Sequence, residues 1–158
     1  MPECFLIEII SNSPQDTFSL GQRIASFLTA GTVVALQGEL GSGKTYLVKG
    51  IAKGLGITET ITSPTYTIIS EYWSSSEDRS SSGDQSSVTL YHIDAYRLDN
   101  DEDFENLGGS EIINSGGISL IEWSERIPKS LPKERITIIF RITGPSSRLI
   151  QISGLDSL

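Results

Sequence analysis

Eight consecutive residues of this chain have the types and the spacing that bind phosphate groups. Residues 38–45 read Gly-Glu-Leu-Gly-Ser-Gly-Lys-Thr and fit the pattern G-x-x-x-x-G-K-[ST] without a mismatch. The glycines permit the tight turn that brings successive backbone N–H groups onto phosphate oxygens. Lys44 is predicted to neutralise the β and γ phosphates, and Thr45 to bind Mg²⁺ through its hydroxyl. The residues expected to contact the nucleotide are Gly38, Glu39, Leu40, Gly41, Ser42, Gly43, Lys44, Thr45 and Tyr46.

Two acidic residues are candidates for the second protein ligand of this Mg²⁺. Asp94 ends an apolar run over residues 88–94, and Glu122 closes a second run that starts at Ile118. Carboxylates at the ends of strands beside a phosphate loop commonly supply such a ligand. We expect at least one of the two carboxylates to bind the Mg²⁺. The apolar runs that precede them do not decide which one.

The segments around the loop have the order that a phosphate-loop protein requires. Residues 32–37 form a β-rich apolar run before the loop, and residues 46–55 have helical spacing after it. Further strands are predicted over residues 4–10, 68–73, 88–94 and 118–123, with a hairpin over 135–142 and 148–152. Short helices are predicted over 101–107 and 111–114. A first helix is expected from a Ser13 cap to about Gly31, with an apolar stripe of Leu20, Ile24, Phe27 and Leu28.

These elements indicate an α/β fold, a P-loop NTPase-like mixed sheet flanked by helices. The 158 residues, 37% of them hydrophobic, suit one domain over residues 1–158. One cysteine and one histidine exclude a disulfide framework and a Cys/His zinc site. A formal charge of −8 argues against independent nucleic-acid binding. The chain shows no basic, apolar leader and no membrane-length apolar run, so we expect a cytoplasmic protein without membrane contact.

Two segments between the predicted strands call for separate interpretations. Thr65 and Thr67 follow Ser63-Pro64 at the place where GTPases carry a switch that senses the γ-phosphate, although an ordinary Ser-Pro turn explains them equally well. Residues 74–87 are rich in serine and charged residues, and we expect them to form a flexible surface loop.

Three further side chains lie close to the candidate carboxylates in sequence. His92 is predicted to face the same side as Asp94, where a structural role is favoured over that of a base. Arg97 and Arg126 each follow a carboxylate, so an ion pair and a phosphate contact are equally expected. No arginine therefore has a clear claim to the γ-phosphate, which predicts slow hydrolysis by the isolated protein.

Four segments, in this order, resemble the TsaE family, small bacterial ATPases of tRNA threonylcarbamoyladenosine biosynthesis. They are the phosphate loop, Ser-Pro-Thr-Tyr-Thr at 63–67, Tyr-His-Ile-Asp-Ala-Tyr-Arg-Leu at 91–98 and Ile-Glu-Trp-Ser-Glu-Arg at 121–126. The resemblance implies ATP and Mg²⁺ as cofactors and the TsaB and TsaD proteins as partners, with tRNA reached only through that complex. Departures from the family pattern are the length of the serine-rich segment, Ala95, and Ser124 in place of a frequent proline.

The resemblance also implies roles for individual residues. Thr45 and Glu122 match the Mg²⁺ ligands of the family, which moves Glu122 ahead of Asp94 as the metal ligand. Asp94 and Trp123 match residues important for activity, and Trp123 is added to the predicted nucleotide-binding residues. Thr65 lies in the segment that behaves as a switch. The predicted catalytic residues are Lys44, Thr65, Asp94 and Glu122.

Two other classes of phosphate-loop protein compete with an ATPase. A small-molecule kinase fits the length and the loop, but kinases normally carry an arginine-bearing lid over the phosphates, and no arginine-rich segment lies in the late-middle of this chain. A GTPase switch requires an [NT]-K-x-D motif that reads the base, and the sequence contains none. The kinase is the alternative that stays open.

Overall fold

The computed structural model describes residues 5–62, 68–74 and 87–158. Its strands are β1 (Leu6–Ser11), β2 (Val33–Gln37), β3 (Ile69–Trp73), β4 (Thr89–Asp94), β5 (Ile118–Glu122), β6 (Ile136–Ile142) and β7 (Arg148–Ser153). Its helices are α1 (Pro14–Ala25), α2 (Lys44–Gly54), α3 (Asp101–Asn106) and α4 (Gly109–Ile113), with a 3₁₀ turn η1 (Ser124–Arg126). Each predicted strand and helix is present, with bounds that shift by a few residues.

The strands form a mixed seven-stranded sheet in the order β1-β7-β6-β2-β5-β4-β3. The four central strands β6, β2, β5 and β4 run parallel, while β1, β7 and β3 add antiparallel edges. The predicted mixed α/β sheet flanked by helices is therefore confirmed. Because β2, β5 and β4 are parallel neighbours, their carboxyl ends meet at one edge of the sheet, where ligands of such folds usually bind.

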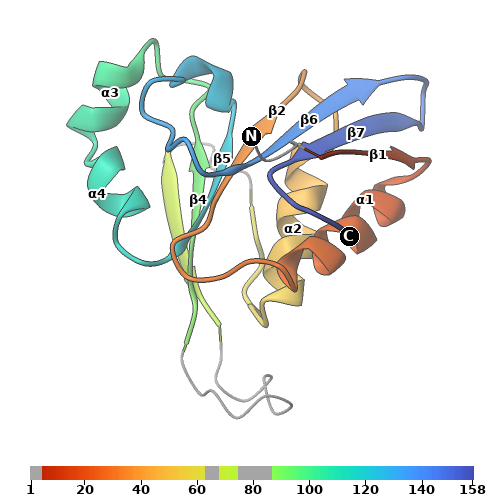
Figure 1. Ribbon diagram of the computed structural model, residues 1–158, viewed down its shortest axis with the longest axis horizontal. Coiled ribbons are helices and arrows are strands. Elements are labelled where there is room, and N and C mark those ends of the chain that lie inside the picture. Colours follow the sequence, from red (N-terminus) through yellow and green to blue (C-terminus); the bar gives the residue numbers. More distant parts are fainter. Residues whose placement is uncertain (1–4, 63–67, 75–86) are drawn as a thin grey trace.

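Helices pack on both faces of this sheet (Figure 1), and two apolar clusters fill the layers between them. Strand β2 shows why, since every residue from Val33 to Leu36 is buried and successive side chains point to opposite faces. Val34 and Leu36 pack with α1 and α2, whereas Val33 packs with Phe104 of α3 on the other face. The central strands are thus held from both sides.

Helix α1 begins as predicted and ends earlier. The Ser13 side chain accepts a hydrogen bond from the Asp16 backbone N–H at 3.1 Å, which confirms the expected cap. The helix stops at Ala25 rather than near Gly31, and Phe27 is exposed, so its place in the apolar stripe was wrong. Phe27 lies beyond the last helical turn, and the helical period that was used to assign it no longer applies there.

Helices α1 and α2 touch through glycines on both sides. A Cβ atom on Gly50 of α2 would lie 2.1 Å from the Phe18 carbonyl oxygen of α1, and one on Gly21 would lie 2.5 Å from the Leu47 carbonyl oxygen. Only glycine permits backbones to approach this closely. The contact packs α1 closely against α2.

The predicted switch and most of the predicted surface loop lie outside the described residues. Thr65 and Thr67 fall in 63–67, and the serine-rich segment falls in 75–86 apart from its ends. Ser74, expected in that loop, is instead buried and pairs with Val88, its backbone N–H donating to the Val88 carbonyl at 3.0 Å. Within the described ranges, no helix is long and apolar enough to cross a bilayer.

Candidate phosphate-loop site

The predicted phosphate loop connects β2 to α2 and leaves the N-terminus of α2 open. Gly43, the cap residue, has φ 104°, a left-handed conformation that favours glycine, and no side chain of the described residues caps the helix. The backbone N–H groups of the first turn therefore point into the loop without a side-chain acceptor. This arrangement, together with the helix dipole, is the usual protein site for a phosphate group.

Lys44 lies inside the loop and is almost fully buried, with 6% of its surface exposed. Its ammonium donates to the carbonyl oxygens of Gly38 and Glu39, the latter at 2.9 Å. Burial lowers the pKa of Lys44 below its usual value, while nearby carboxylates, Glu122 foremost, act in the opposite direction. The structure thus holds a cation at the centre of the loop.

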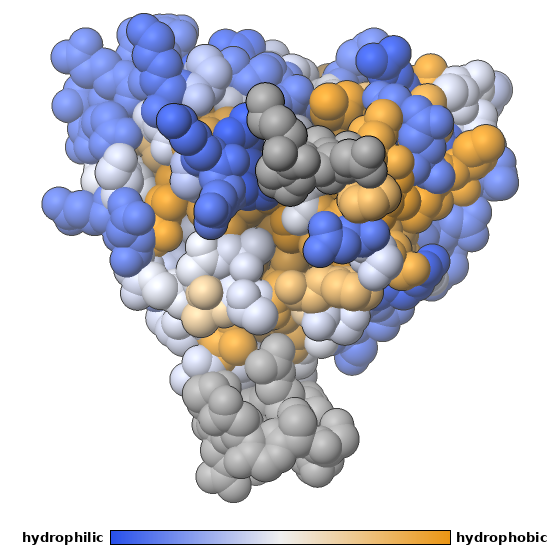
Figure 2. Space-filling model, in the orientation of Figure 1, coloured by the Kyte–Doolittle hydropathy of each residue, from blue (hydrophilic) through white to orange (hydrophobic). Residues whose placement is uncertain are grey.

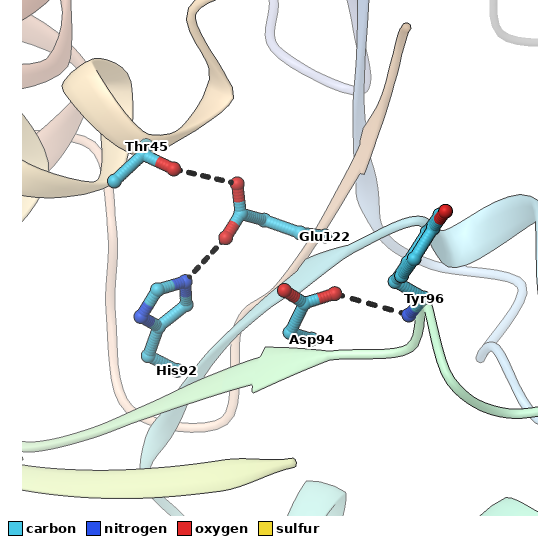
Figure 3. Close-up of polar contacts among 5 residues, drawn as sticks. All are labelled: Thr45, His92, Asp94, Tyr96 and Glu122. Carbon is cyan, nitrogen blue, oxygen red and sulfur yellow. Dashed lines mark hydrogen bonds and ion pairs between the residues drawn. The ribbon is translucent and has the colours of Figure 1, made fainter. Parts of the chain in front are cut away.

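The two candidate carboxylates lie side by side at the ends of β4 and β5. Asp94 and Glu122 are paired in the parallel register of these strands. Glu122 is 3% exposed, and its Oε1 accepts a hydrogen bond from the Thr45 hydroxyl at 3.2 Å (Figure 3). Asp94 points differently and accepts from the Tyr96 backbone N–H at 3.0 Å. The geometry therefore brings Glu122, and not Asp94, into contact with Thr45.

The oxygen atoms gathered here fit a magnesium ion by their chemistry. Mg²⁺ prefers hard oxygen ligands and usually binds one or two protein groups while it keeps several waters. The Thr45 hydroxyl and the Glu122 carboxylate supply two such oxygens beside the loop, and Asp94 lies next to Glu122. Thr45 and Glu122 are the residues that would hold the metal.

Asp94 faces the same space and keeps its own hydrogen bond. Its pKa is raised above the usual value, mainly because burial disfavours the charged carboxylate, and the Tyr96 N–H bond opposes this. Glu122 adds to the increase, because a second negative charge lies beside it. A partly buried carboxylate that is not committed to Thr45 is placed to contact water or phosphate in the cavity.

Trp123 directly follows Glu122 in a strained backbone conformation. Its φ of 57° makes it the one non-glycine residue with positive φ among those described. The turn places the indole ring 4.4 Å from the Lys44 ammonium and 5.0 Å from the Tyr96 ring. A cation over an indole is attracted to the ring face. Backbone strain of this kind clusters at binding sites, and here it aims an aromatic side chain at the loop lysine.

Arg126 lies against these aromatic rings. Its guanidinium is 5.2 Å from the Tyr96 ring, and it donates to the Leu98 carbonyl at 3.4 Å. Neither Arg126 nor Arg97 forms a salt bridge with another described residue, so of the two alternatives the ion pair is not found there. Arg97 is exposed.

These groups surround a cavity of about 510 Å³, a size typical of small-molecule sites. Leu40 to Tyr46 line it, together with Asp94, Glu122 and Trp123, and Leu40 is 85% exposed at its rim. Gly38 and Glu39 do not line the cavity, and they contribute through the carbonyl groups that bind Lys44. The structure thus brings most predicted site residues to one place.

Sequence reasoning missed the walls of the cavity that come from distant elements. These lining residues are Ser13, Pro14 and Thr17 at the start of α1, Tyr96 after β4, and Pro145, Ser146 and Arg148 around the β6–β7 turn. Arg148 donates to the Gly41 carbonyl at 3.0 Å, which ties the turn to the loop. Tyr96 could have been found, since it lies two residues after a candidate carboxylate. Arg148 could not, because it lies far from Gly41 in sequence and on β7, which β6 separates from β2.

Comparisons with known proteins match this chain to one family. The family model described as Threonylcarbamoyl adenosine biosynthesis protein TsaE matches residues 11–150. A relative from Treponema pallidum, named tRNA threonylcarbamoyladenosine biosynthesis protein TsaE, is 41% identical over 91% of this chain and 98% of its own length. A Bacillus subtilis protein of the same name is 36% identical, over 92% of this chain and 84% of its own.

A solved structure is similar in fold as well. The crystal structure of Bacillus subtilis YdiB superposes with a TM-score of 0.76 at 31% sequence identity. The superposition covers 97% of this chain and 88% of that one. The overall fold of this chain therefore recurs in that protein.

Proposed function

Because this chain belongs to the TsaE family of threonylcarbamoyl adenosine biosynthesis proteins, we propose that it is an ATP-hydrolysing component of tRNA N6-threonylcarbamoyladenosine modification. The observation that carries the ATPase part is the 3.2 Å contact between the Thr45 hydroxyl and Glu122 Oε1 beside the phosphate loop. This pair would supply two oxygen ligands for the Mg²⁺ of a bound nucleotide. One comes from the phosphate loop and one from the end of a neighbouring strand, as expected of a P-loop NTPase.

The chain's own residues divide the work of hydrolysis among them. The α2 N-terminus and Lys44 bind the phosphates and offset their charge. Thr45 and Glu122 hold Mg²⁺, which when bound neutralises charge that develops on the β and γ oxygens. Asp94, which is partly buried and faces the cavity, orients the attacking water. Trp123 packs over the Lys44 ammonium and shields it from solvent.

Product analysis tests this function against the kinase alternative. With ATP and Mg²⁺ we expect ADP and inorganic phosphate to accumulate in equal amounts, and adding small hydroxyl or amine acceptors to leave that ratio unchanged. GTP and the other nucleotides serve as the comparison, and EDTA is expected to stop the reaction. Transfer of the phosphoryl group to an acceptor in place of water would identify a kinase.

We further propose that TsaB and TsaD are the partners and that tRNA is bound by the complex rather than by this chain. The formal charge of −8 disfavours a direct phosphate-backbone contact and suits docking on a basic protein face. Arg126 is engaged with Tyr96 and the Leu98 carbonyl, and Arg148 with the Gly41 carbonyl, so neither of these two arginines is free to act at the γ-phosphate without rearrangement. Such a cation is worth about 10³ to 10⁵ in rate when a partner supplies or releases it.

Adding TsaB and TsaD is therefore expected to raise ATP turnover by at least about tenfold, and less at high salt, because exposed charges are screened. The measurement is steady-state ATPase with and without the partners across a salt series, with Lys44→Ala as the blank. Binding is checked separately by sedimentation. If the complex forms and turnover is unchanged, the active site is complete within this chain and activation by partners is refuted.

A further inference from the structure

His92 lies directly behind the carboxylate assigned to the metal. It is fully buried in β4, and its Nε2 is 2.7 Å from Glu122 Oε2 (Figure 3). A carboxylate accepts hydrogen bonds and has none to donate, so Nε2 carries the hydrogen of this contact. His92 does not line the nucleotide cavity. Among the described site residues, Glu122 is the one to which it is hydrogen-bonded.

The contact accounts for a histidine that packing alone does not favour. The other ring nitrogen, Nδ1, is buried without a hydrogen-bond partner in the described part of the chain. Burying an unpaired polar atom costs free energy, and an apolar side chain would avoid that cost. Two residues earlier on the same face of β4, the buried position 90 is occupied by an apolar residue, Leu90. The gain at position 92 must therefore come from the bond to Glu122.

This bond divides the two oxygens of Glu122 between two tasks. Oε2 is held by His92 from β4, and Oε1 faces the Thr45 hydroxyl at the start of α2. With one oxygen fixed, the carboxylate cannot rotate and the other oxygen stays directed at Thr45. Partners that orient a metal-binding carboxylate in this way are typically worth 10 to 100-fold in metal affinity.

We propose that His92 is a positioning residue that fixes the Glu122 carboxylate for Mg²⁺, an inference that rests on the proposed function. It excludes a role for His92 as a general base, because the buried ring reaches neither the cavity nor water within it. Asp94, on the same strand and lining the cavity, is the group with that access.

The test compares His92→Leu, which removes the donor, with His92→Gln, whose side-chain amide keeps a donor at similar reach. Calorimetry measures ATP binding in EDTA and over a Mg²⁺ titration. We expect His92→Leu to weaken the Mg²⁺ dependence by about 10 to 100-fold, to leave binding in EDTA unchanged, and to be largely rescued in His92→Gln. If His92→Leu does not fold, His92→Asn, whose amide is too short to reach Glu122, is expected to show the same loss.

Two outcomes would overturn the inference: a folded His92→Leu with wild-type Mg²⁺ dependence, or a folded His92→Gln as impaired as His92→Leu. Glu122→Gln in the same titration distinguishes a failure of the positioning role of His92 from a failure of the proposed Mg²⁺ site. If Glu122→Gln loses Mg²⁺ dependence and His92→Leu does not, only the positioning role fails. If Glu122→Gln keeps it, the metal site proposed at Glu122 is wrong.

Discussion

Lys44→Ala is expected to lower ATP hydrolysis by at least about a hundredfold, because removing a charge-assisted contact to transferring phosphate costs a few kcal/mol of transition-state stabilisation. The Lys44 ammonium is buried within the loop and bonded to its carbonyl groups, so no other described side chain occupies its place. The measurement is the rate of phosphate release at saturating ATP and Mg²⁺.

Lys53→Ala is the matched control for this variant. Lys53 lies in the last turn of the same helix, is exposed, and has the same charge. It is expected to hydrolyse ATP at the wild-type rate. Thermal unfolding of both variants checks that α2 is intact. A folded Lys44→Ala protein that keeps its activity would remove the loop from the mechanism.

The two carboxylates are expected to respond differently to substitution. Glu122→Gln should weaken Mg²⁺-dependent ATP binding by at least about tenfold, because it removes the charged ligand paired with Thr45. Asp94→Asn should leave binding intact and lower turnover by about 10²-fold or more, the scale of a lost general base or water-orienting group. Calorimetry gives the first quantity and single-turnover hydrolysis the second.

The opposite pattern would exchange these roles. If Asp94→Asn loses Mg²⁺ and Glu122→Gln loses only turnover, Asp94 is the metal ligand, and the Thr45–Glu122 contact belongs to another state of the site. Asp99→Asn is the control, since Asp99 is an exposed carboxylate that does not line the cavity, and it should alter neither quantity.

The parts of the site predicted from sequence are those that local chemistry dictates. The phosphate loop is contiguous, so its glycines, Lys44 and Thr45 could be assigned from spacing alone. The Ser13 cap was equally local, because a helix start needs only the side chain that accepts from its first turn. Strand patterns likewise predicted the mixed sheet, with each carboxylate at a strand end.

What could not be predicted depends on contacts between distant segments. Asp94 and Glu122 end equally apolar strands, and only their different hydrogen bonds, to Tyr96 and Thr45, distinguish them in the structure. The contact of His92 with Glu122 joins the neighbouring strands β4 and β5. Nothing in the sequence around either residue predicts that the two will meet. Local patterns also placed the end of α1 too late, near Gly31 rather than at Ala25.

The apolar surface around the edge strands is a further consequence of the sheet order. Leu6 and Ile10 of β1 are exposed, and Figure 2 shows other hydrophobic residues at the surface of the face in view, interspersed with hydrophilic ones. Chains with exposed apolar residues on an edge strand are prone to edge-to-edge association. Charged Glu8 lies between these two residues and is bonded to Gln151 of β7, which interrupts the apolar edge.

The position of β2 determines when the active site can form during synthesis. Strand β2, which carries the phosphate loop, has β5 and β6 as its neighbours, and β1 pairs with β7, so each pairing waits for the second half of the chain. When distant segments must meet, closing the intervening chain costs entropy before the stabilising contacts form. Such folds therefore form slowly. On the ribosome, the first half emerges with its central strand unpaired. The nucleotide site is therefore a late product of folding, available to ATP only after the last strands have been made.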